Sequence, residues 1–365
     1  QEMQVITRAK MGMIYWLVPR MWGTKLYSKS LANAHFWIGT LGIVFYAIPL
    51  YFAGFTQSLM WKQFTPDGYL VYKNFLDTVL QIKYAYWMRS LGGLLFLTGA
   101  CIMVYNVWKT MASGKLIANE DAEAPALEKN YVGESGGHWH RWIERRPIQM
   151  LVVSLVVVAA GGIIEIIPTF LIESNVPTIT QVKPYTPLEL HGRDIYVMEG
   201  CYTCHSQMVR PFRSETERYG EYSKAGEFIY DHPFQWGSKR TGPDLHRVGG
   251  KYPDSWHYYH MYDPSSMNAG SLMPSYTHMY ENLIDKEMIP KKIRAMQTLG
   301  VPYPEGYDQQ AVADLEAQAA KVVASLKKDG IEADPNADII ALIAYLQRLG
   351  TDIKQKPADQ VVQVK

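Results

Sequence analysis

Long apolar runs dominate the chain up to about position 175, whereas the remainder mixes apolar and polar positions as a water-exposed domain does. Three of these runs, 35–55, 87–108 and 149–172, are uninterrupted. About 20 apolar residues suffice to cross a ~30 Å hydrocarbon core as a helix. A shorter run at 11–19 predicts the end of a fourth helix. The pattern therefore predicts a multi-pass membrane protein.

Helix signals continue beyond the apolar runs. Thr186 precedes Pro187, and Glu189 follows at the third helical position, which is a capping-box start. This predicts a helix over 187–199, and an amphipathic pattern predicts another over 311–328. A last helix is expected to start at the Asp-Pro pair 334–335, because apolar residues then recur at three- and four-residue intervals. The sequence thus predicts a mainly α chain, with transmembrane helices followed by an extracytoplasmic all-α domain.

Composition narrows the possible partners. The formal net charge is only +1 over 365 residues, so no broad polyelectrolyte surface for nucleic acid is expected. Three cysteines are too few for a disulfide framework. We expect Cys101, inside an apolar run, to behave as a small buried hydrophobe.

The other two cysteines lie in the run C-Y-T-C-H at 201–205. Two thiols at this spacing can each form a thioether to a haem vinyl group, and the next residue is then the fifth iron ligand. Cys201, Cys204 and His205 are therefore predicted to bind one covalent haem c. Half of a zinc site and a redox dithiol are the alternatives. Zinc would need histidines from elsewhere, and a dithiol has no need of His205.

A methionine is the usual sixth ligand opposite histidine in high-potential cytochromes. Met208 is too close in sequence to reach the other haem face. We choose Met273, because Pro274 stiffens the loop that would hold the thioether on the iron. The remaining candidates are Met261, Met267, Met279, Met288 and Met296, with His246, His257, His260 and His278 as imidazole alternatives.

Haem c is attached outside the bacterial cytoplasm, so the last span is expected to run outward from the cytoplasm. The basic, aromatic stretch 138–146 before it suits a cytoplasmic interface. The polar segment before that stretch reads as a cytoplasmic linker or an ordinary loop. Pro168 is expected to kink or end the last span. Glu165, at membrane depth, is a functional candidate or a side chain that snorkels to the interface.

Longer motifs resemble a known family. The runs G-R-D-I-Y at 192–196, G-C-Y-T-C-H-S-Q-M-V-R-P-F at 200–212 and Y-D-H-P-F-Q-W-G-S-K-R-T-G-P-D-L at 230–245 resemble the mono-haem cytochrome subunit (subunit II) of cbb3-type cytochrome c oxidases. The resemblance covers about 137–350. Upstream, Y-W-L-V-P-R-M-W-G at 15–23 is similar to the end of the catalytic subunit I, as are 33–37 and 105–109.

The two resemblances together imply a fusion. Residues 1–110 would be truncated catalytic-subunit helices, 111–136 a cytoplasmic linker, 137–175 a membrane anchor, and 176–365 the mono-haem cytochrome domain. The helices that hold b-type haems and copper are expected to precede Gln1, so a fragment or altered N-terminus is expected. The metal-binding histidine motif is missing from this sequence. We interpret His35 as an interface residue, and no catalytic residue is assigned.

The resemblance implies electron transfer through haem c to a haem–copper centre that reduces oxygen to water and pumps protons. The implied location is the bacterial inner membrane, with the cytochrome domain on the periplasmic side. Implied partners are a di-haem cytochrome c subunit, the catalytic haem–copper portion and membrane lipid. The carbonyl of Pro243 would fix His205 by a hydrogen bond. A calcium ion lies between these subunits in the family, with Gly237 and Ser238 as candidate oxygen donors here.

Two other functions stay open at this point. One is the membrane-anchored mono-haem subunit of a nitric oxide reductase, and the other is a haem-based sensor with an open sixth position. The W-G-S-K-R stretch at 236–240 and the upstream helices favour the oxidase. Arg210, Arg213, Lys239 and Arg240 flank the haem motifs, where they could neutralise propionates, form a docking surface or simply be solvated.

Overall fold

The computed structural model describes residues 2–117, 146–171, 178–237 and 239–354. Regular structure in these ranges is helical, and no strand forms there beyond two isolated bridges, Phe64 with Leu70 and Leu283 with Ala337. The described residues divide into two compact units. One contains 1–60 and 78–155, and the other contains 61–77 and 156–365. We describe each unit by itself.

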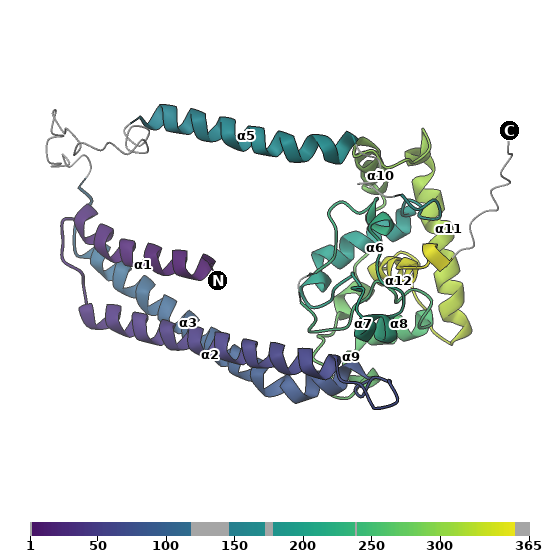
Figure 1. The fold of residues 1–365 in the computed structure, drawn as a ribbon, viewed down its shortest axis with the longest axis horizontal. Coiled ribbons are helices and arrows are strands. Elements are labelled where there is room, and N and C mark those ends of the chain that lie inside the picture. The colour runs from purple at the N-terminus through teal and green to yellow at the C-terminus, as the bar shows by residue number, and fades with distance from the viewer. Residues whose placement is uncertain (1, 118–145, 172–177, 238, 355–365) are drawn as a thin grey trace. The chain divides into compact units, whose positions relative to one another are not determined.

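Three helices are long and apolar enough to cross a membrane: α2 (Lys29–Trp61), α3 (Phe75–Ala112) and α5 (Pro147–Leu171) (Figure 1). These helices coincide with the three predicted spans, although α2 and α3 extend well beyond the apolar runs. Pro168 does not end α5, which continues to Leu171. Helix α1 (Glu2–Met21) contains the fourth run but begins well before it.

Glycines bring α2 and α3 into close contact. A Cβ added to Gly42 would lie 2.7 Å from the Phe96 nitrogen and 2.8 Å from the Gly92 oxygen. A Cβ added to Gly92 would lie 2.7 Å from the Gly42 oxygen. Small residues that let backbones approach are typical of helix pairs in membranes.

The expectation that Cys101 is buried is wrong for this chain, because its side chain on α3 is exposed.

Asn106 of α3 holds the start of α2. Its Oδ1 accepts a hydrogen bond from the Ser28 nitrogen at 3.0 Å, and its Nδ2 donates to the Ser28 oxygen at 2.8 Å. Thr110, one turn later, accepts from the Tyr27 nitrogen at 3.0 Å. Both α3 side chains are fully buried. They bind the backbone of Tyr27 and Ser28, the two residues directly before α2 begins.

Asn106→Leu should therefore weaken the α2–α3 pair. Ser28 would lose a partner for both its nitrogen and its oxygen, at a cost of roughly 1–3 kcal/mol. Unfolding of the detergent-solubilised chain by titration with SDS should need less SDS. Thr98→Val is the control, since Thr98 is exposed and bonds only within its own helix. Equal midpoints for the two variants would contradict this role for Asn106.

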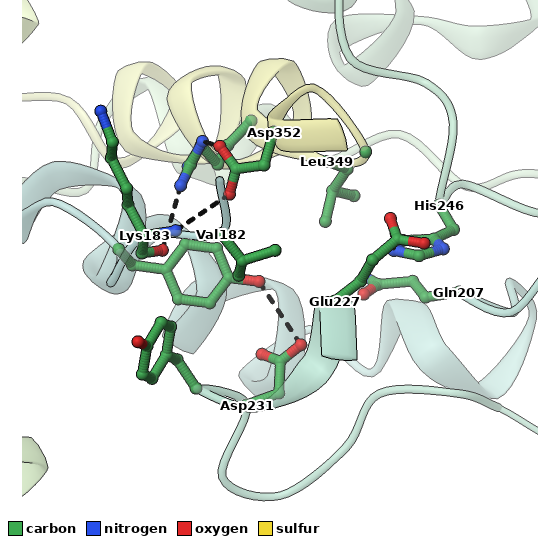
Figure 2. A pocket seen from close by; sticks show the side chains of 12 residues that line it. Val182, Lys183, Gln207, Glu227, Asp231, His246, Leu349 and Asp352 are labelled. Atoms are coloured by element: carbon green, nitrogen blue, oxygen red, sulfur yellow. Dashed lines mark hydrogen bonds and ion pairs between the residues drawn. The ribbon is translucent and has the colours of Figure 1, made fainter. Parts of the chain in front are cut away.

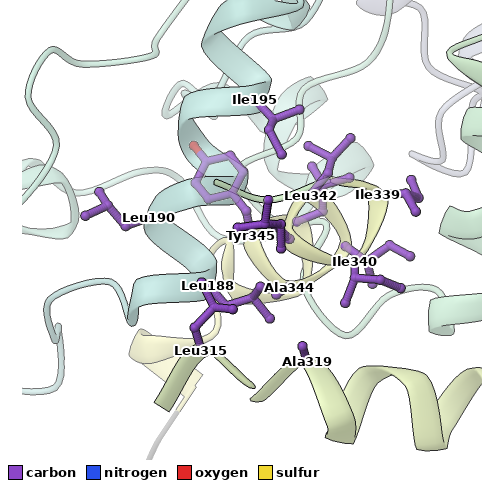
Figure 3. Packing of buried hydrophobic residues seen from close by; sticks show 14 of the residues in the cluster. Leu188, Leu190, Ile195, Leu315, Ala319, Ile339, Ile340, Leu342, Ala344 and Tyr345 are labelled. Carbon is purple, nitrogen blue, oxygen red and sulfur yellow. The ribbon is translucent and has the colours of Figure 1, made fainter. Parts of the chain in front are cut away.

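The C-terminal helices enclose an apolar core. They are α6 (Pro187–Met198), α7 (Arg213–Tyr219), α8 (Asp254–Tyr262), α9 (Pro264–Met267), α10 (Ile289–Thr298), α11 (Tyr307–Lys328) and α12 (Asp338–Arg348). Short 3₁₀ turns are η2 (Cys201–Thr203), η3 (Ala225–Phe228), η4 (Thr277–Tyr280) and η5 (Asp352–Lys354). Figure 3 shows the core: Leu188 and Ile195 of α6 and Leu315 of α11 surround α12, whose apolar side chains are almost all buried.

Helices α6 and α12 cross at Gly192. A Cβ there would overlap the Ala341 carbonyl oxygen and lie 2.8 Å from the Tyr345 Cβ, so only glycine allows this approach.

The capping box predicted for α6 is confirmed: Thr186 accepts from the Glu189 nitrogen and Glu189 accepts from the Thr186 nitrogen. The predicted start of α12 is wrong, because it begins at Asp338. Asp334 instead makes a turn, accepting from the Asn336 nitrogen at 2.8 Å.

Gly192→Ala should destabilise the C-terminal helices. The methyl group would force α6 and α12 apart, and overpacking of this kind costs about 1–3 kcal/mol. Near-ultraviolet circular dichroism of the solubilised chain should report a lower unfolding midpoint. The matched control is Gly161→Ala in α5, where a Cβ would meet nothing within 4 Å. An unchanged midpoint for Gly192→Ala would mean that this crossing tolerates a side chain.

Candidate functional site

The cysteine motif begins where α6 ends. Glu199 caps the helix, and Gly200 turns the chain with a φ of +68°, a left-handed conformation that glycine adopts without strain. The next residues form the 3₁₀ turn η2, and the His205 nitrogen donates to the Cys201 oxygen at 2.9 Å. This tight turn holds Cys201, Cys204 and His205 together on the end of a helix whose other end is fixed in the core.

The His205 ring is oriented by a backbone carbonyl. Its Nδ1 lies 2.8 Å from the Pro243 oxygen. Because a carbonyl can only accept, Nδ1 carries the proton and Nε2 keeps its lone pair. Burial lowers the pKa of His205, although the Pro243 carbonyl and Asp244 act in the opposite direction. The ring is therefore a neutral imidazole near pH 7, which is the form that binds iron.

Gly242 makes room for that ring. A Cβ at this position would overlap the imidazole of His205, so the chain must lack a side chain here. The Gly242 nitrogen donates to the Cys204 oxygen at 2.9 Å, and the Leu245 nitrogen donates to the Ser206 oxygen at 2.8 Å. These two bonds bind the segment around Gly242 and Pro243 to the cysteine motif on both sides of His205.

The cysteines do not have the properties of a redox dithiol. Burial, and then the charge of Glu199, raises the pKa of Cys201 to about 12. Reactive dithiols need the opposite, a thiol whose pKa is lowered toward neutrality. The described residues also contain no group of three or more His, Cys, Asp or Glu side chains placed to hold a metal ion. Neither alternative for this motif gains support from the geometry.

Met273 lies in the segment between α9 and η4. It is half-buried and packs against the same core as Cys201. His278 at the end of this segment lies 2.8 Å from the Glu199 carboxylate, beside the motif. Burial, followed by the nearby Cys201 and Cys204, raises the pKa of Tyr276 to about 12. The methionine segment and the cysteine motif are thus brought together.

The other methionines occupy different environments. Met261, Met279 and Met296 are buried members of the core, whereas Met267 and Met288 are exposed. Met208 is adjacent to the motif, and its nitrogen donates to Asp244 at 2.8 Å. Met273 combines a half-buried side chain with a place in the segment that His278 ties to Glu199, next to the cysteine motif. These positions favour Met273 as the sixth ligand, and its role stays a prediction.

A buried ionic cluster that was not predicted from the sequence bonds to the residues directly after the motif. Arg240 donates to Ser206 at 2.7 Å, to the Met208 oxygen at 2.8 Å and to Glu215 at 2.9 Å. Asp244 accepts from Ser206 at 2.6 Å. Arg240 is therefore no solvated charge, because only 8% of its side chain is exposed. In the sequence, only the position of Asp244 directly after Gly242 and Pro243 could have indicated that it lies near His205.

The remaining flanking cations are placed differently. Arg210 pairs with Glu215, and Arg213 pairs with Glu217 at 2.7 Å while its side chain is 64% exposed. Of the two candidate calcium ligands, Ser238 lies outside the described residues. Gly237 has a φ of +67°, and a Cβ there would lie 2.7 Å from the His205 oxygen. Gly237 therefore packs tightly on the backbone of the motif.

A cavity of about 30 Å³ lies in the C-terminal domain. Gln207, Glu227 and His246 line it in Figure 2, together with Asp231 and Asp352. None of the predicted haem residues does. Its small volume and polar lining suit an ordered water. Burial, with a contribution from Arg247, lowers the pKa of His246 to about 3, so this ring is neutral.

The residues around the motif fit a covalently bound haem. Two thiols flank the turn, Nε2 of His205 keeps a lone pair, Gly242 leaves space beside the ring, and a methionine segment lies close by. A carbonyl that fixes the ligand tautomer is the usual second partner of a metal-binding histidine. These features fit the residues that would hold a His-ligated haem c.

Comparison with known proteins gives two family matches in one chain. Residues 140–353, more than half of the sequence, match the family model described as cytochrome c oxidase, mono-haem subunit/FixO. Residues 3–95 match cytochrome c and quinol oxidase polypeptide I.

Individual relatives match the N-terminal part. A cytochrome c oxidase subunit 1 homologue of Agrobacterium tumefaciens is 50% identical over 101 residues, 27% of this chain and 19% of that protein. Cytochrome c oxidase subunit 1 of Rhodobacter capsulatus is 43% identical over 116 residues, 32% of this chain and 22% of that protein. A cbb3-type subunit CcoN1 of Stutzerimonas stutzeri is 33% identical over 111 residues, 30% and 23% of the two chains. The chain spans about a fifth of the length of these relatives.

The motif geometry and the longer of the two matches agree, and both concern the C-terminal part of the chain. The chain belongs to the FixO family of mono-haem cytochrome c oxidase subunits.

Proposed function

We propose that this chain is the electron-transfer subunit of a membrane-bound cbb3-type oxidase, and that it relays electrons through one haem c held by Cys201 and Cys204. The observation that carries the proposal is the His205–Pro243 hydrogen bond, which leaves Nε2 directed away from its backbone anchor with a lone pair. The family match supports an oxidase complex rather than a nitric oxide reductase or a sensor.

The haem, when bound, supplies reversible one-electron chemistry, and the protein supplies placement. His205 is held as a neutral ligand, and Met273 lies in a segment anchored beside the motif through His278. The ionic cluster of Arg240, Glu215 and Asp244 keeps the backbone around His205 fixed. A rigid ligand set keeps the rearrangement between oxidation states small, which favours rapid electron exchange. No proton donor or nucleophile is required from this chain.

The proposal extends to the assembly. Residues 1–110 would be fused catalytic-subunit helices, 111–136 a cytoplasmic linker, 137–175 the anchor, and 176–365 a periplasmic cytochrome domain. The two family matches on one chain and the three apolar helices support this organisation. Electrons would come from a di-haem cytochrome c subunit and pass to a haem–copper portion that reduces oxygen and pumps protons. Calcium at the subunit interface stays a prediction.

A reduced pyridine-haemochrome spectrum of the chain purified from its native membrane tests the cofactor directly. We expect a haem c signal that Cys201→Ser and Cys204→Ser abolish or convert, because each change removes one thioether. Cys101→Ser is the matched control and should leave the spectrum unchanged. Haem b alongside haem c would show that the catalytic portion purifies with this chain. A wild-type chain without haem c would refute the proposal.

Met273→His tests the sixth ligand. Replacing a thioether by imidazole should lower the midpoint potential by tenths of a volt, since axial ligands set haem potentials over roughly 0.8 V. The methionine-to-iron charge-transfer band of the oxidised protein should disappear in redox-titrated samples. Met267→His, at an exposed position of α9, should change neither property. Retention of the band in Met273→His would assign the ligand to another residue.

A further inference from the structure

The 62–74 loop, which joins α2 to α3, is folded on itself. Phe64 and Leu70 form an antiparallel bridge within it, and Leu70 is buried. The Gly68 nitrogen donates to the Thr65 oxygen at 2.9 Å, which closes a turn. Gly68 has a φ of +84°, a conformation that glycine adopts without strain. The bridge and the turn hold the carbonyl groups of the 62–74 loop in one arrangement.

Helix α7 of the C-terminal domain binds this loop through two arginines. The loop and α7 belong to the same compact unit. Arg213 donates from Nη2 to the Gly68 oxygen at 2.7 Å, and its guanidinium lies 4.7 Å from the centroid of the Phe64 ring. Arg218 donates from Nη1 to the Lys73 oxygen at 3.0 Å. Arginines at the two ends of α7 therefore bind the backbone of the loop at two separate points.

A third contact links this region to the support of the cysteine motif. The guanidinium of Arg240 lies 6.0 Å from the centroid of the Trp61 ring, at the last residue of α2, within the range of a cation–π attraction. The same guanidinium donates to the Ser206 hydroxyl and to the Met208 oxygen. The contact with Trp61 thus reaches the ionic cluster that bonds to the residues directly after His205.

Arginine suits these contacts because its guanidinium carries several N–H donors in one plane. Arg213 donates from Nε to Glu217 at 2.7 Å, which orients the group while Nη2 binds Gly68. A Cβ on Gly68 would lie 3.1 Å from this Nη2, so a side chain there would press on the contact. The arginines of α7 therefore fit a glycine-tipped turn that presents backbone oxygens and an aromatic ring.

The proposed topology independently brings these segments to one side of the membrane. One span, α3, separates the 62–74 loop from the proposed linker 111–136. One further span, α5, separates that linker from the cytochrome domain. Two crossings return the chain to the side from which it started. The loop and α7 can therefore meet without either of them crossing the membrane.

We infer that Arg213, Arg218 and Arg240 form a docking surface for the 62–74 loop. This contact attaches the cytochrome domain to the helices on either side of the loop independently of the linker 111–136. The inference rests on the proposed function for the linker and for the cytochrome domain. The partner of the surface is a segment of this same chain, recognised through its backbone oxygens and its aromatic rings.

The test uses the full chain with a protease recognition sequence inserted into the proposed linker 111–136 and an affinity tag at the C-terminus. After cleavage in mild detergent, the wild-type N-terminal piece should stay bound to the tagged piece. Arg213→Ala and Arg218→Ala should each raise the apparent dissociation constant of the two pieces by about tenfold, because each removes a hydrogen bond from a charged donor. Gly68→Ala should weaken the association from the other side of the contact.

Two control variants show whether the contact itself is measured. Arg294→Ala removes a comparably exposed arginine of α10 that pairs with Asp308, and it should leave the association unchanged. Lys73→Ala should also leave it unchanged, because Arg218 binds the backbone oxygen of this residue. Near-ultraviolet circular dichroism of each uncleaved variant should match wild type, which separates a lost contact from a misfolded domain.

Two results would overturn the inference. One is separation of the wild-type pieces after cleavage, which would mean that the linker alone holds them together. The other is wild-type association in the combined Arg213→Ala, Arg218→Ala variant, which would assign the attachment to other residues. Neither result alters the haem c spectrum on which the proposed function is tested, so the failure of one leaves the other standing.

Discussion

The crossing of α6 and α12 at Gly192 determines where the rest of the C-terminal domain can lie. Its absent side chain lets α6 approach the Ala341 carbonyl, and Tyr345 of α12 fills the space beside it. The hydroxyl of Tyr345 then accepts from Gln207 at 3.0 Å, two residues beyond His205. One helix crossing therefore fixes both the end of α6, where the cysteine motif begins, and the segment that leaves it.

Loops rather than helices surround the motif, and buried charges replace the apolar core there. Arg193 pairs with Asp231 at 2.7 Å, with both side chains 4% exposed. Arg240 bridges Glu215 and Asp244, and Arg247 holds Glu227. Such pairs add little net stability compared with well-packed apolar groups, but losing one partner costs about 3–5 kcal/mol. A change at any one of these residues would therefore leave a buried, unpaired charge in the loops around the motif.

Local sequence patterns predicted the positions of the helices well, but they did not predict which distant residues contact one another. The capping box at Thr186 and Glu189 was readable because both residues lie within one helical turn. The three spans were readable because a membrane imposes length and hydropathy together. The start of α12 was misplaced because an Asp-Pro pair favours a turn and a helix start equally, and Asp334 uses its side chain for the turn. The support of Arg240 by Ser206 and Glu215 joins positions 34 and 25 residues apart, which no spacing rule connects.

The hydrogen bonds of a buried imidazole decide which of its ring nitrogens is free to bind a ligand. The motif names His205, but only the Pro243 contact assigns its proton to Nδ1 and so leaves Nε2 for a ligand bond. His246 and His257 are both buried, and burial lowers the pKa of each, but their hydrogen bonds differ. The Nδ1 of His246 is bonded to the Ser223 hydroxyl, whereas neither ring nitrogen of His257 has a partner among the described residues. Cavity size does not make this distinction, since the small polar cavity lies beside the satisfied histidine. Hydrogen-bond partners, rather than burial or cavity volume, therefore decide which ring nitrogen of a buried histidine is occupied.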